Sequence, residues 1–591
     1  MWRWARKFPS AGYSAAFASA SLLVLVPAAR LDFNRHHSGY ELAQAIAVHA
    51  GTSIHDGVAG QYGPVTPWLQ SLALYFPASP ALSLQLLNAL LIAVTLFLLA
   101  DIGRRCPEDW PDMRGAGWAA AFAWLVLCDV WIGVPMFPWS STLAAALSVG
   151  TLYALSRAIR CSDEDSPMRA TLWAMGAGAA VGLMPFTRIN IGLASLAVIV
   201  VLCVVSFGSR GSATRRLSIS VLVGAGATIL ACVAVLISSG AVVDYFMQAV
   251  LWPLQWGGRA AESKHTLGNL RGLLVQQAVP LILFAAVLVL QFKADSRFDS
   301  HFRKRALAVF TVCSGLLIVV WEQKLVAVEV EGSEGWSSLL SPSRIVAIAT
   351  TPNTSYMYLF FFTSLLVIVG VIGCASMALL RRGRESARIC PWLLTAGLGL
   401  ASLTQVVPTW DTRHVWWGAP VPLLLLFVAV DKVGSLWTPT RNPLWLPLVA
   451  AFVMATLSGH AFVTKARVDA PTGSVLAGMR VEGSVARAIT EDQNLLARYL
   501  QGAESAVFLV SDGDLSILSG TFRSADAYFV SWGDVPLLST RLGTNPPIII
   551  QRQTADAAEG AEDEARAEIA KLTDYQLSAS NGRLLIYTRR S

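Results

Sequence analysis

The feature that most constrains this chain is a series of apolar blocks, each about 20 residues long and almost free of charged side chains. A helix of that length crosses the hydrocarbon core of a bilayer, whereas an open strand there would leave its backbone groups without hydrogen-bond partners. The blocks therefore predict membrane-spanning helices. We expect thirteen, at residues 11–30, 81–100, 115–133, 142–159, 170–187, 189–207, 217–240, 271–291, 306–323, 357–380, 391–408, 418–432 and 443–461.

Charged residues are few and are placed like topology signals. Only 14% of the 591 residues are charged, against about 25% in soluble proteins, which excludes an ordinary soluble enzyme. The net charge of +7 does not indicate nucleic-acid binding, because the basic residues stand at the ends of the apolar blocks. With a cytoplasmic N-terminus, the inner connections hold 23 Lys and Arg residues and the outer ones eight, in agreement with the positive-inside rule.

We expect a multi-pass protein of a bacterial inner (plasma) membrane, and the asymmetry predicts that its N-terminus lies in the cytoplasm. The first apolar run, 11–30, could be a cleaved signal peptide, but we favour an uncleaved span because the residues after it look functional. An odd number of spans places the C-terminus outside the cytoplasm.

The composition changes at about residue 462, where the chain becomes polar and mixed. Short apolar runs predict strands, and two longer segments, Ala488–Leu500 and Ala558–Leu572, predict helices. The expected strands are Ala506–Val510, Ala527–Val530, Ile548–Ile550 and Leu584–Tyr587. The expected fold is thus an all-α polytopic membrane domain over 1–461, with an outer loop at 31–80, and a small α/β extracytoplasmic domain over 462–591.

The outer loop at 31–80 is too long for a simple connection. Leu42, Ala45, Ile46 and His49 recur with helical spacing and leave Glu41 on another face, which predicts a short amphipathic helix lying in the membrane interface. Pro64 and Pro67 suit the first turn of a second helix, which is too short to span. Two such helices would form a cap over a cavity at the membrane surface.

Three stretches of the chain carry a resemblance to a known superfamily. They are Gln61-Tyr62-Gly63-Pro64 in the outer loop, Pro185-Phe-Thr-Arg188-Ile-Asn190-Ile-Gly192, and Pro408-Thr-Trp-Asp411-Thr-Arg413-His414-Val-Trp-Trp417. Together with the first span and its polar loop, they resemble GT-C-fold glycosyltransferases. The resemblance extends to the protein mannosyltransferase and aminoarabinose transferase group and to RgtA/B/C/D-like membrane proteins.

The resemblance implies a polyprenyl-phosphate-linked sugar as donor and an acidic residue of the outer loop as base. Asp32 is the first candidate because it stands at the outer end of the first span, and Asp56 and Glu41 follow. Asp32 could instead only solvate a helix end. Relatives often have His-Asp-Gly or an acidic pair where this chain has His37-Ser38-Gly39, so the base is a neighbouring carboxylate or the chain has lost transferase activity.

Several residues are candidates for binding the substrate. Arg188 stands between two apolar blocks, where an unpaired charge usually marks function or snorkelling. Asp411, Arg413 and His414 lie in a segment rich in tryptophan, which an aromatic belt would also explain. The remaining candidates are His36, His37 and Tyr62 of the outer loop.

No sequence pattern indicates a metal site or a cofactor. The eight cysteines show no CxxC or Cys/His spacing, and the adjacent His36 and His37 point in different directions on either a strand or a helix. A divalent cation is left open as a possible requirement.

The sequence therefore predicts an inverting glycosyltransferase that moves a sugar from a polyprenyl-phosphate donor to a lipid, glycan or protein acceptor of the envelope, on the outer face of the membrane. A transporter or flippase for lipid-linked glycans is the main alternative, but it would place ionisable residues at mid-membrane, whereas here they gather at one face. A non-catalytic envelope assembly protein is the second alternative, favoured by Ser38.

Overall fold

The computed structural model describes most of the chain. The described residues are 10–31, 33, 35, 37–55, 60, 62–105, 113–129, 139–207, 212–251, 278, 281–282, 286, 354–382, 390–406, 412–435, 467–470, 476–500, 506–509, 548–551 and 561–590. Within them the chain is mainly helical.

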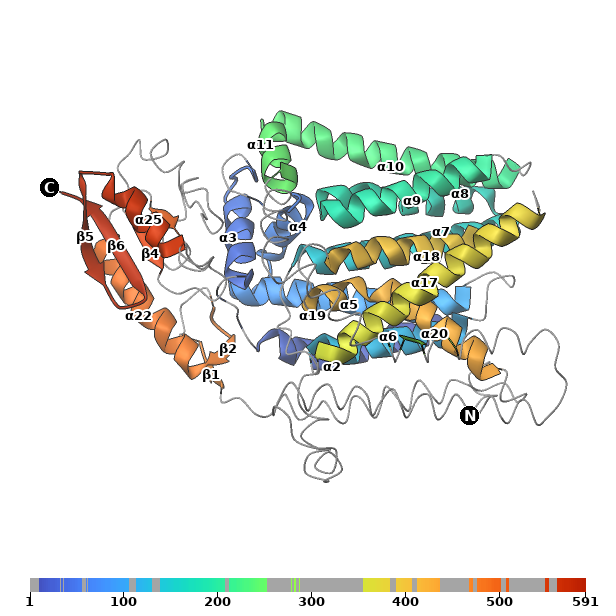
Figure 1. Ribbon diagram of the computed structural model, residues 1–591, viewed down its shortest axis with the longest axis horizontal. Helices are drawn as coiled ribbons and strands as arrows, with labels where there is room; N and C mark the ends of the chain where they lie inside the picture. The colour runs from blue at the N-terminus through green and yellow to red at the C-terminus, as the bar shows by residue number, and fades with distance from the viewer. Residues whose placement is uncertain are drawn as a thin grey trace, which may run out of the picture.

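Ten helices of the bundle coincide with ten of the expected spans (Figure 1). They are α2 (Ser10–Ala29), α5 (Pro80–Arg105), α6 (Met113–Asp129), α7 (Ser140–Asp163), α8 (Pro167–Leu183), α9 (Ile189–Phe207), α10 (Ser212–Ser238), α17 (Thr354–Arg382), α18 (Cys390–Leu403) and α20 (Pro420–Ser435). Four of these, α2, α5, α7 and α10, are long and apolar enough to cross a membrane, so the chain is a multi-pass membrane protein. The spans expected at 306–323 and 443–461, and nearly all of 271–291, lie outside the described residues.

Glycines let α8 and α10 pack closely. A Cβ added at Gly178 would overlap the Val221 carbonyl of α10, and one added at Gly224 would overlap the Met175 carbonyl of α8. Small residues of this kind allow helix backbones to approach within a membrane, where van der Waals packing replaces the hydrophobic effect as the driving force.

Two tryptophans join α6 to α19 (Thr412–Gly418), a short helix at one end of the bundle. The indole N–H of Trp124 donates to the Trp416 carbonyl at 3.0 Å, and that of Trp416 donates to the Trp124 carbonyl at 3.1 Å. Their rings stack with centroids 4.9 Å apart. Both buried indoles thus satisfy their donors while filling the core.

The outer loop forms two short helices at the same end of the bundle, α3 (His37–His49) and α4 (Val65–Ala73) (Figure 1). α4 begins after Pro64, as expected. α3 differs from the expected interfacial helix because its polar face is also buried: Glu41 is 1% and Gln44 3% exposed. The polar face of α3 is therefore covered by protein and is not turned to water.

Within its described residues, the tail contains two helices and two sheets. A two-stranded sheet pairs β1 (Arg467–Asp469) with β2 (Arg480–Glu482), and a four-stranded sheet has the order β3-β4-β6-β5. The elements of the larger sheet are β3 (Val507–Leu509), β4 (Ile548–Gln551), β5 (Tyr575–Ser580) and β6 (Leu584–Arg589), and the helices are α22 (Gly483–Tyr499) and α25 (Ala561–Ala570). β3 and β4 are parallel and the other pairs antiparallel.

Three of the expected strands and both expected helices fall on these elements, while Ala527–Val530 lies outside the described residues. The boundary between the two domains stays a prediction.

Candidate active site

Arg188 is a buried cation at the end of the bundle that carries the outer loop. It follows a short 3-10 turn, Met184–Phe186, between α8 and α9, and it is 6% exposed. Its Nη1 donates to the Ser141 hydroxyl at 2.9 Å, and its guanidinium lies over the Tyr62 ring, 4.6 Å from the centroid. Among the described residues its Nε has no hydrogen-bond partner, which is costly for a buried charged group.

The outer loop lies directly against the connection that holds Arg188. The Gly63 N–H donates to the Thr187 carbonyl at 3.3 Å, and a Cβ at Gly63 would overlap the Phe186 carbonyl. Only glycine allows the two backbones to come this close. This contact places Tyr62 beside the guanidinium of Arg188.

Glu41 is the buried acidic group of the site. Its Oε2 accepts a hydrogen bond from Gln70 Nε2 of α4 at 3.0 Å. Burial raises the pKa of Glu41 to about 8, and the Gln70 hydrogen bond and the charge of Arg188 only partly oppose this rise. Burial likewise raises the pKa of Tyr62, while the nearby Arg188 lowers it. Glu41, Tyr62 and Arg188 therefore form one electrostatically coupled group.

A row of aromatic rings connects this group to α19. Tyr62 meets Trp139 edge to face at 5.2 Å, Trp139 stacks on Trp417 at 6.1 Å, and Trp417 meets the His414 ring at 5.4 Å. The Ser141 hydroxyl that binds Arg188 also accepts a hydrogen bond from Gln405 Nε2 at 3.0 Å.

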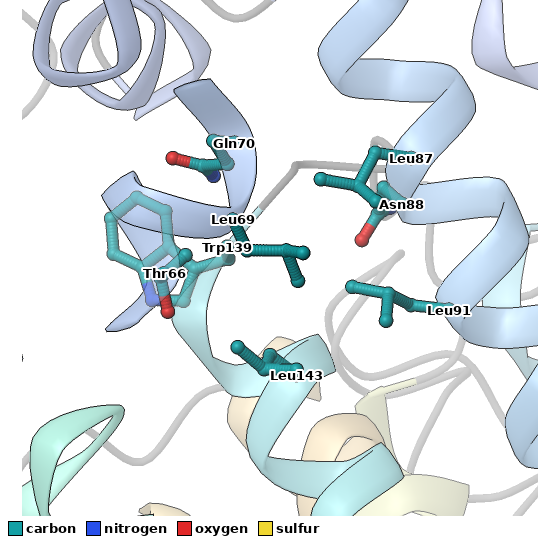
Figure 2. Close-up of a pocket in the computed structure, with 8 residues that line it drawn as sticks. All are labelled: Thr66, Leu69, Gln70, Leu87, Asn88, Leu91, Trp139 and Leu143. Atoms are coloured by element: carbon teal, nitrogen blue, oxygen red, sulfur yellow. The ribbon is translucent and has the colours of Figure 1, made fainter. Parts of the chain in front are cut away.

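A small pocket lies next to the Glu41–Gln70 pair (Figure 2). The cavity itself measures only about 10 Å³, roughly the room that one water molecule needs. Its lining is mostly neutral and apolar: Thr66, Leu69, Gln70, Leu87, Asn88, Leu91, Trp139 and Leu143. The Thr66 hydroxyl and Asn88 Oδ1 are buried and have no partner within the described part of the chain.

His55 fixes the other part of the outer loop. Its Nδ1 and the Gly60 N–H both lie within hydrogen-bond distance of Gln248 Oε1, at 3.1 and 2.8 Å, and Gln248 Nε2 donates to the His55 carbonyl at 2.9 Å. His55 has a φ of 75°, a conformation that is strained for a residue with a side chain. Burial lowers the pKa of His55 to about 4, so the ring is neutral at neutral pH.

The structure thus brings together candidates from all three stretches that carried the resemblance. The Arg188 guanidinium contacts the Tyr62 ring, and Glu41 interacts electrostatically with both. His414 is connected to Tyr62 through the row of aromatic rings. Arg413 lies on the same short helix as His414, and His37 begins α3. Four candidates lie outside the described residues: Asp32, His36, Asp56 and Asp411. The catalytic and binding roles of all these residues stay predictions.

Sequence reasoning did not single out the partners of the charged groups. Gln70 binds Glu41, and Ser141, Gln405 and Trp139 surround Arg188 and Tyr62. A signal was present, because Ser140-Ser141-Thr142 and Gln405 are polar residues at the ends of apolar blocks, where an ordinary span needs none.

Among the residues that the structure describes, no three His, Cys, Asp or Glu side chains form a group that could hold a metal ion. The possible divalent cation therefore stays a prediction.

No family model and no curated protein matches this chain. Solved structures do match. The crystal structures of ArnT from Cupriavidus metallidurans, apo and bound to undecaprenyl phosphate, share 13% identity with it at TM-scores of 0.43 and 0.44. The apo structure aligns over 98% of this chain and 97% of ArnT, and the bound one over 99% of each.

The cryo-EM structure of arabinosyltransferase EmbB from Mycobacterium smegmatis matches at 14% identity and a TM-score of 0.29, over 76% of this chain and 43% of EmbB. One of these neighbours is thus bound to a polyprenyl phosphate and another is a glycosyltransferase by name, as in the group that the sequence motifs resemble.

Proposed function

We propose that this chain is a membrane glycosyltransferase that takes a sugar from a polyprenyl-phosphate donor and transfers it to a lipid, glycan or protein acceptor of the cell envelope. The observation that carries the proposal is the buried guanidinium of Arg188, held by Ser141 and Tyr62 next to the carboxyl group of Glu41. The Nε–H of this buried arginine has no hydrogen-bond partner among the described residues, which suits an anionic ligand. The fork geometry of a guanidinium group fits a phosphate.

The proposed reaction is a direct displacement at the anomeric carbon with inversion. The acceptor hydroxyl oxygen forms the new bond to carbon, and its proton passes to a carboxylate of the outer loop. The bond from the anomeric carbon to the phosphate oxygen breaks, and that oxygen leaves with the electron pair. Arg188, assisted by Arg413 and His414 on α19, stabilises the negative charge that develops on the leaving phosphate.

Of the three candidate bases, Glu41 is the one whose surroundings are described. Its pKa of about 8 lies near the pH at which such an enzyme works, which is the range in which a general base is most effective. Asp32 and Asp56 belong to the same loop and remain candidates for this role.

We further propose that the site faces the outside of a bacterial inner membrane. The support is the distribution of basic residues, 23 on the expected inner connections and eight on the outer ones. In this orientation α3, α4 and the tail all lie on the outer side, where lipid-linked donors and envelope acceptors meet.

The test is transfer of radiolabelled sugar from a panel of polyprenyl-phosphate donors to envelope acceptors in isolated membranes. Arg188→Ala should abolish transfer, and Arg188→Lys should restore only a small part of it because lysine lacks the planar fork. Arg160→Ala, which removes a half-exposed arginine at the opposite end of α7, is the matched control and should leave transfer unchanged.

The base is identified by comparing Glu41→Gln, Asp32→Asn and Asp56→Asn at equal protein levels in the same assay. The variant that loses transfer while still binding donor carries the base. Two results together would refute the transferase and indicate a flippase. Wild-type membranes would transfer no sugar from any donor, and cells lacking the protein would accumulate lipid-linked glycan on the inner side of the membrane.

A further inference from the structure

α3 lies between the tail and the candidate active site, and it contacts both. In Figure 1 it crosses the end of the helical bundle, with α22 and the larger sheet beyond it. Leu42 and Ala45 of α3 belong to a buried apolar cluster with Leu496 of α22 and Leu584 of β6. Glu41, the residue next to Leu42, turns to Gln70 on the side of the bundle. A shift of the tail would therefore be transmitted to the Glu41 carboxyl group.

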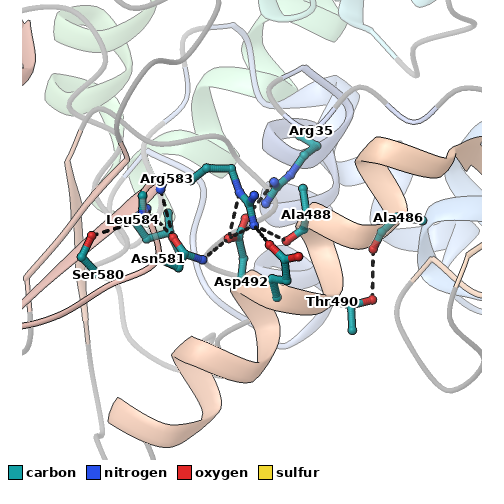
Figure 3. Close-up of polar contacts among 11 residues, drawn as sticks. Arg35, Ala486, Ala488, Thr490, Asp492, Ser580, Asn581, Arg583 and Leu584 are labelled. Carbon is teal, nitrogen blue, oxygen red and sulfur yellow. Dashed lines mark hydrogen bonds and ion pairs between the residues drawn. The ribbon is translucent and has the colours of Figure 1, made fainter.

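A single buried carboxylate ties the tail to the start of α3. Asp492 of α22 is 1% exposed. One of its oxygens accepts from Arg35 Nη1 at 2.9 Å, and the other accepts from Asn581 Nδ2 at 2.8 Å and from Arg583 Nη2 at 3.1 Å. Figure 3 shows both arginines reaching this carboxylate.

The geometry makes Arg35 the link between Asp492 and the site. Arg35 stands two residues before α3 begins, and its side chain is 12% exposed. Removing the charge of Asp492 would take this counter-ion from Arg35, whose side chain is largely buried, while Arg583 is 38% exposed and keeps Glu491. Loss of one partner of a buried ion pair is a strongly destabilising change for the contact.

Further contacts hold the same junction. Leu31 forms a parallel bridge with Arg480, and Arg30 Nε donates to the Gly478 carbonyl at 2.9 Å. The Ser79 hydroxyl, at the far end of the outer loop, donates to the Ala477 carbonyl. Both ends of the outer loop are therefore fastened to one segment of the tail, and Asp492 adds a charged contact between the tail and the residue two positions before α3.

We propose that Asp492 is a positioning residue: through Arg35 it holds α3 so that Glu41 stays in the candidate active site, which makes the tail a structural part of that site. This inference rests on the proposed function of Glu41. It assigns the tail a role in setting the geometry of the reaction, in addition to any contact with an acceptor.

The test compares Asp492→Asn with Glu491→Gln in the full-length protein in detergent. Glu491 is the adjacent residue on the same helix and also binds Arg583, at 2.7 Å, but its side chain is 59% exposed. The first readout is hydrogen exchange of residues 37–49. Asp492→Asn should speed exchange there about tenfold, and Glu491→Gln should leave it unchanged.

The second readout is the pH profile of sugar transfer. A smaller fraction of folded enzyme would lower the rate at every pH but would not shift the profile along the pH axis. Among the described residues, the charged or titratable groups coupled to Glu41 are Arg188, after the 3-10 turn, and Tyr62, in the loop, while α4 presents the neutral Gln70. When α3 loosens, water reaches Glu41 and its pKa falls. The acidic limb of the profile should then move to lower pH in Asp492→Asn only.

Unchanged exchange of residues 37–49 in Asp492→Asn would overturn the proposal. If wild-type protein shows no transfer with any donor, the proposed glycosyltransferase function is wrong, but the exchange measurement still tests whether Asp492 positions α3. The proposed function and the positioning role can therefore be refuted independently. If Asp492→Asn does not fold, Arg35→Gln replaces it, because that variant keeps the Asp492–Arg583 pair of the tail intact; the same faster exchange of residues 37–49 is expected.

Discussion

Replacing Glu41 by glutamine should stabilise the folded protein, and more so at about pH 7.5 than at about pH 5.5. Burial raises the pKa of Glu41 from 4.5 to about 8 in the folded protein. Between these values the folded protein holds one proton more than the unfolded chain, so the free energy of unfolding falls as pH rises. Over this pH interval the wild type should lose roughly 2 kcal/mol that the glutamine variant does not lose.

The assay is equilibrium unfolding in detergent micelles at the two pH values, followed by tryptophan fluorescence. Glutamine has nearly the size of glutamate, and its amide oxygen can accept the hydrogen bond from Gln70. His55 titrates in the opposite sense, because its pKa is lowered to about 4 and stability is gained as pH rises toward the unfolded value. Subtracting the free energy of unfolding of the wild type from that of the variant at each pH removes the contributions of His55 and of every other titratable group that the two proteins share.

Asp563→Asn is the control, since Asp563 is an exposed carboxylate on α25. Its difference from the wild type should be the same at both pH values. If Glu41→Gln also shows equal differences at the two pH values, the carboxyl group is not held protonated in the folded state, and the description of a buried, partly compensated Glu41 is refuted.

Gly63→Ala should lower sugar transfer about a hundredfold, because the added Cβ would overlap the Phe186 carbonyl and a displacement of about 1 Å at a reacting site has that effect; initial rates in membranes measure it. Gln248→Leu should speed hydrogen exchange over residues 51–62, because His55 loses its partner. Gly224→Leu should reduce the yield of monodisperse protein in gel filtration, because the side chain would push α10 away from α8.

Gly176→Ala is the control for both glycine variants, since a Cβ at Gly176 meets no atom within 4 Å. It should behave as the wild type in transfer and in gel filtration. Full activity of Gly63→Ala would show that the outer loop does not depend on its close contact with the 185–188 connection. Unchanged exchange in Gln248→Leu would remove the assigned role of the His55 contact.

The membrane helices could be predicted from sequence because one property, apolar length, decides them. α5 and α10 lie within a few residues of the expected spans 81–100 and 217–240. The burial of Glu41 and Gln44 on α3 could not be predicted, because a polar face on a short helix normally faces water. The groups that interact with Glu41 on this face are distant in sequence: Gln70 on α4 donates a hydrogen bond to it, and Arg188, after α8, interacts with its charge.

The tail was predicted less completely. β6 and β4 are continuous apolar runs and were expected, whereas β5 has the polar sequence Tyr575-Gln-Leu-Ser-Ala-Ser580, in which most side chains are exposed or half-buried. Such an edge strand gives no apolar signal. In the site, the motifs indicated Tyr62, Arg188 and His414, but a local motif cannot show that Ser141 and Trp139 connect them.

The junction between Arg35 and Asp492 joins residues 457 positions apart. At a synthesis rate of about 5 to 20 residues per second, the segment before α3 waits roughly 20 to 90 s after it is made until its partner exists. During that time the helices of the bundle can already pack, and Gln70 can bind Glu41, but the charged contact that anchors the start of α3 is still missing. If Asp492 has the proposed positioning role, the site is completed only after α22 has been translated, and a chain terminated before α22 has the preceding helices of the bundle but lacks the contact that positions α3.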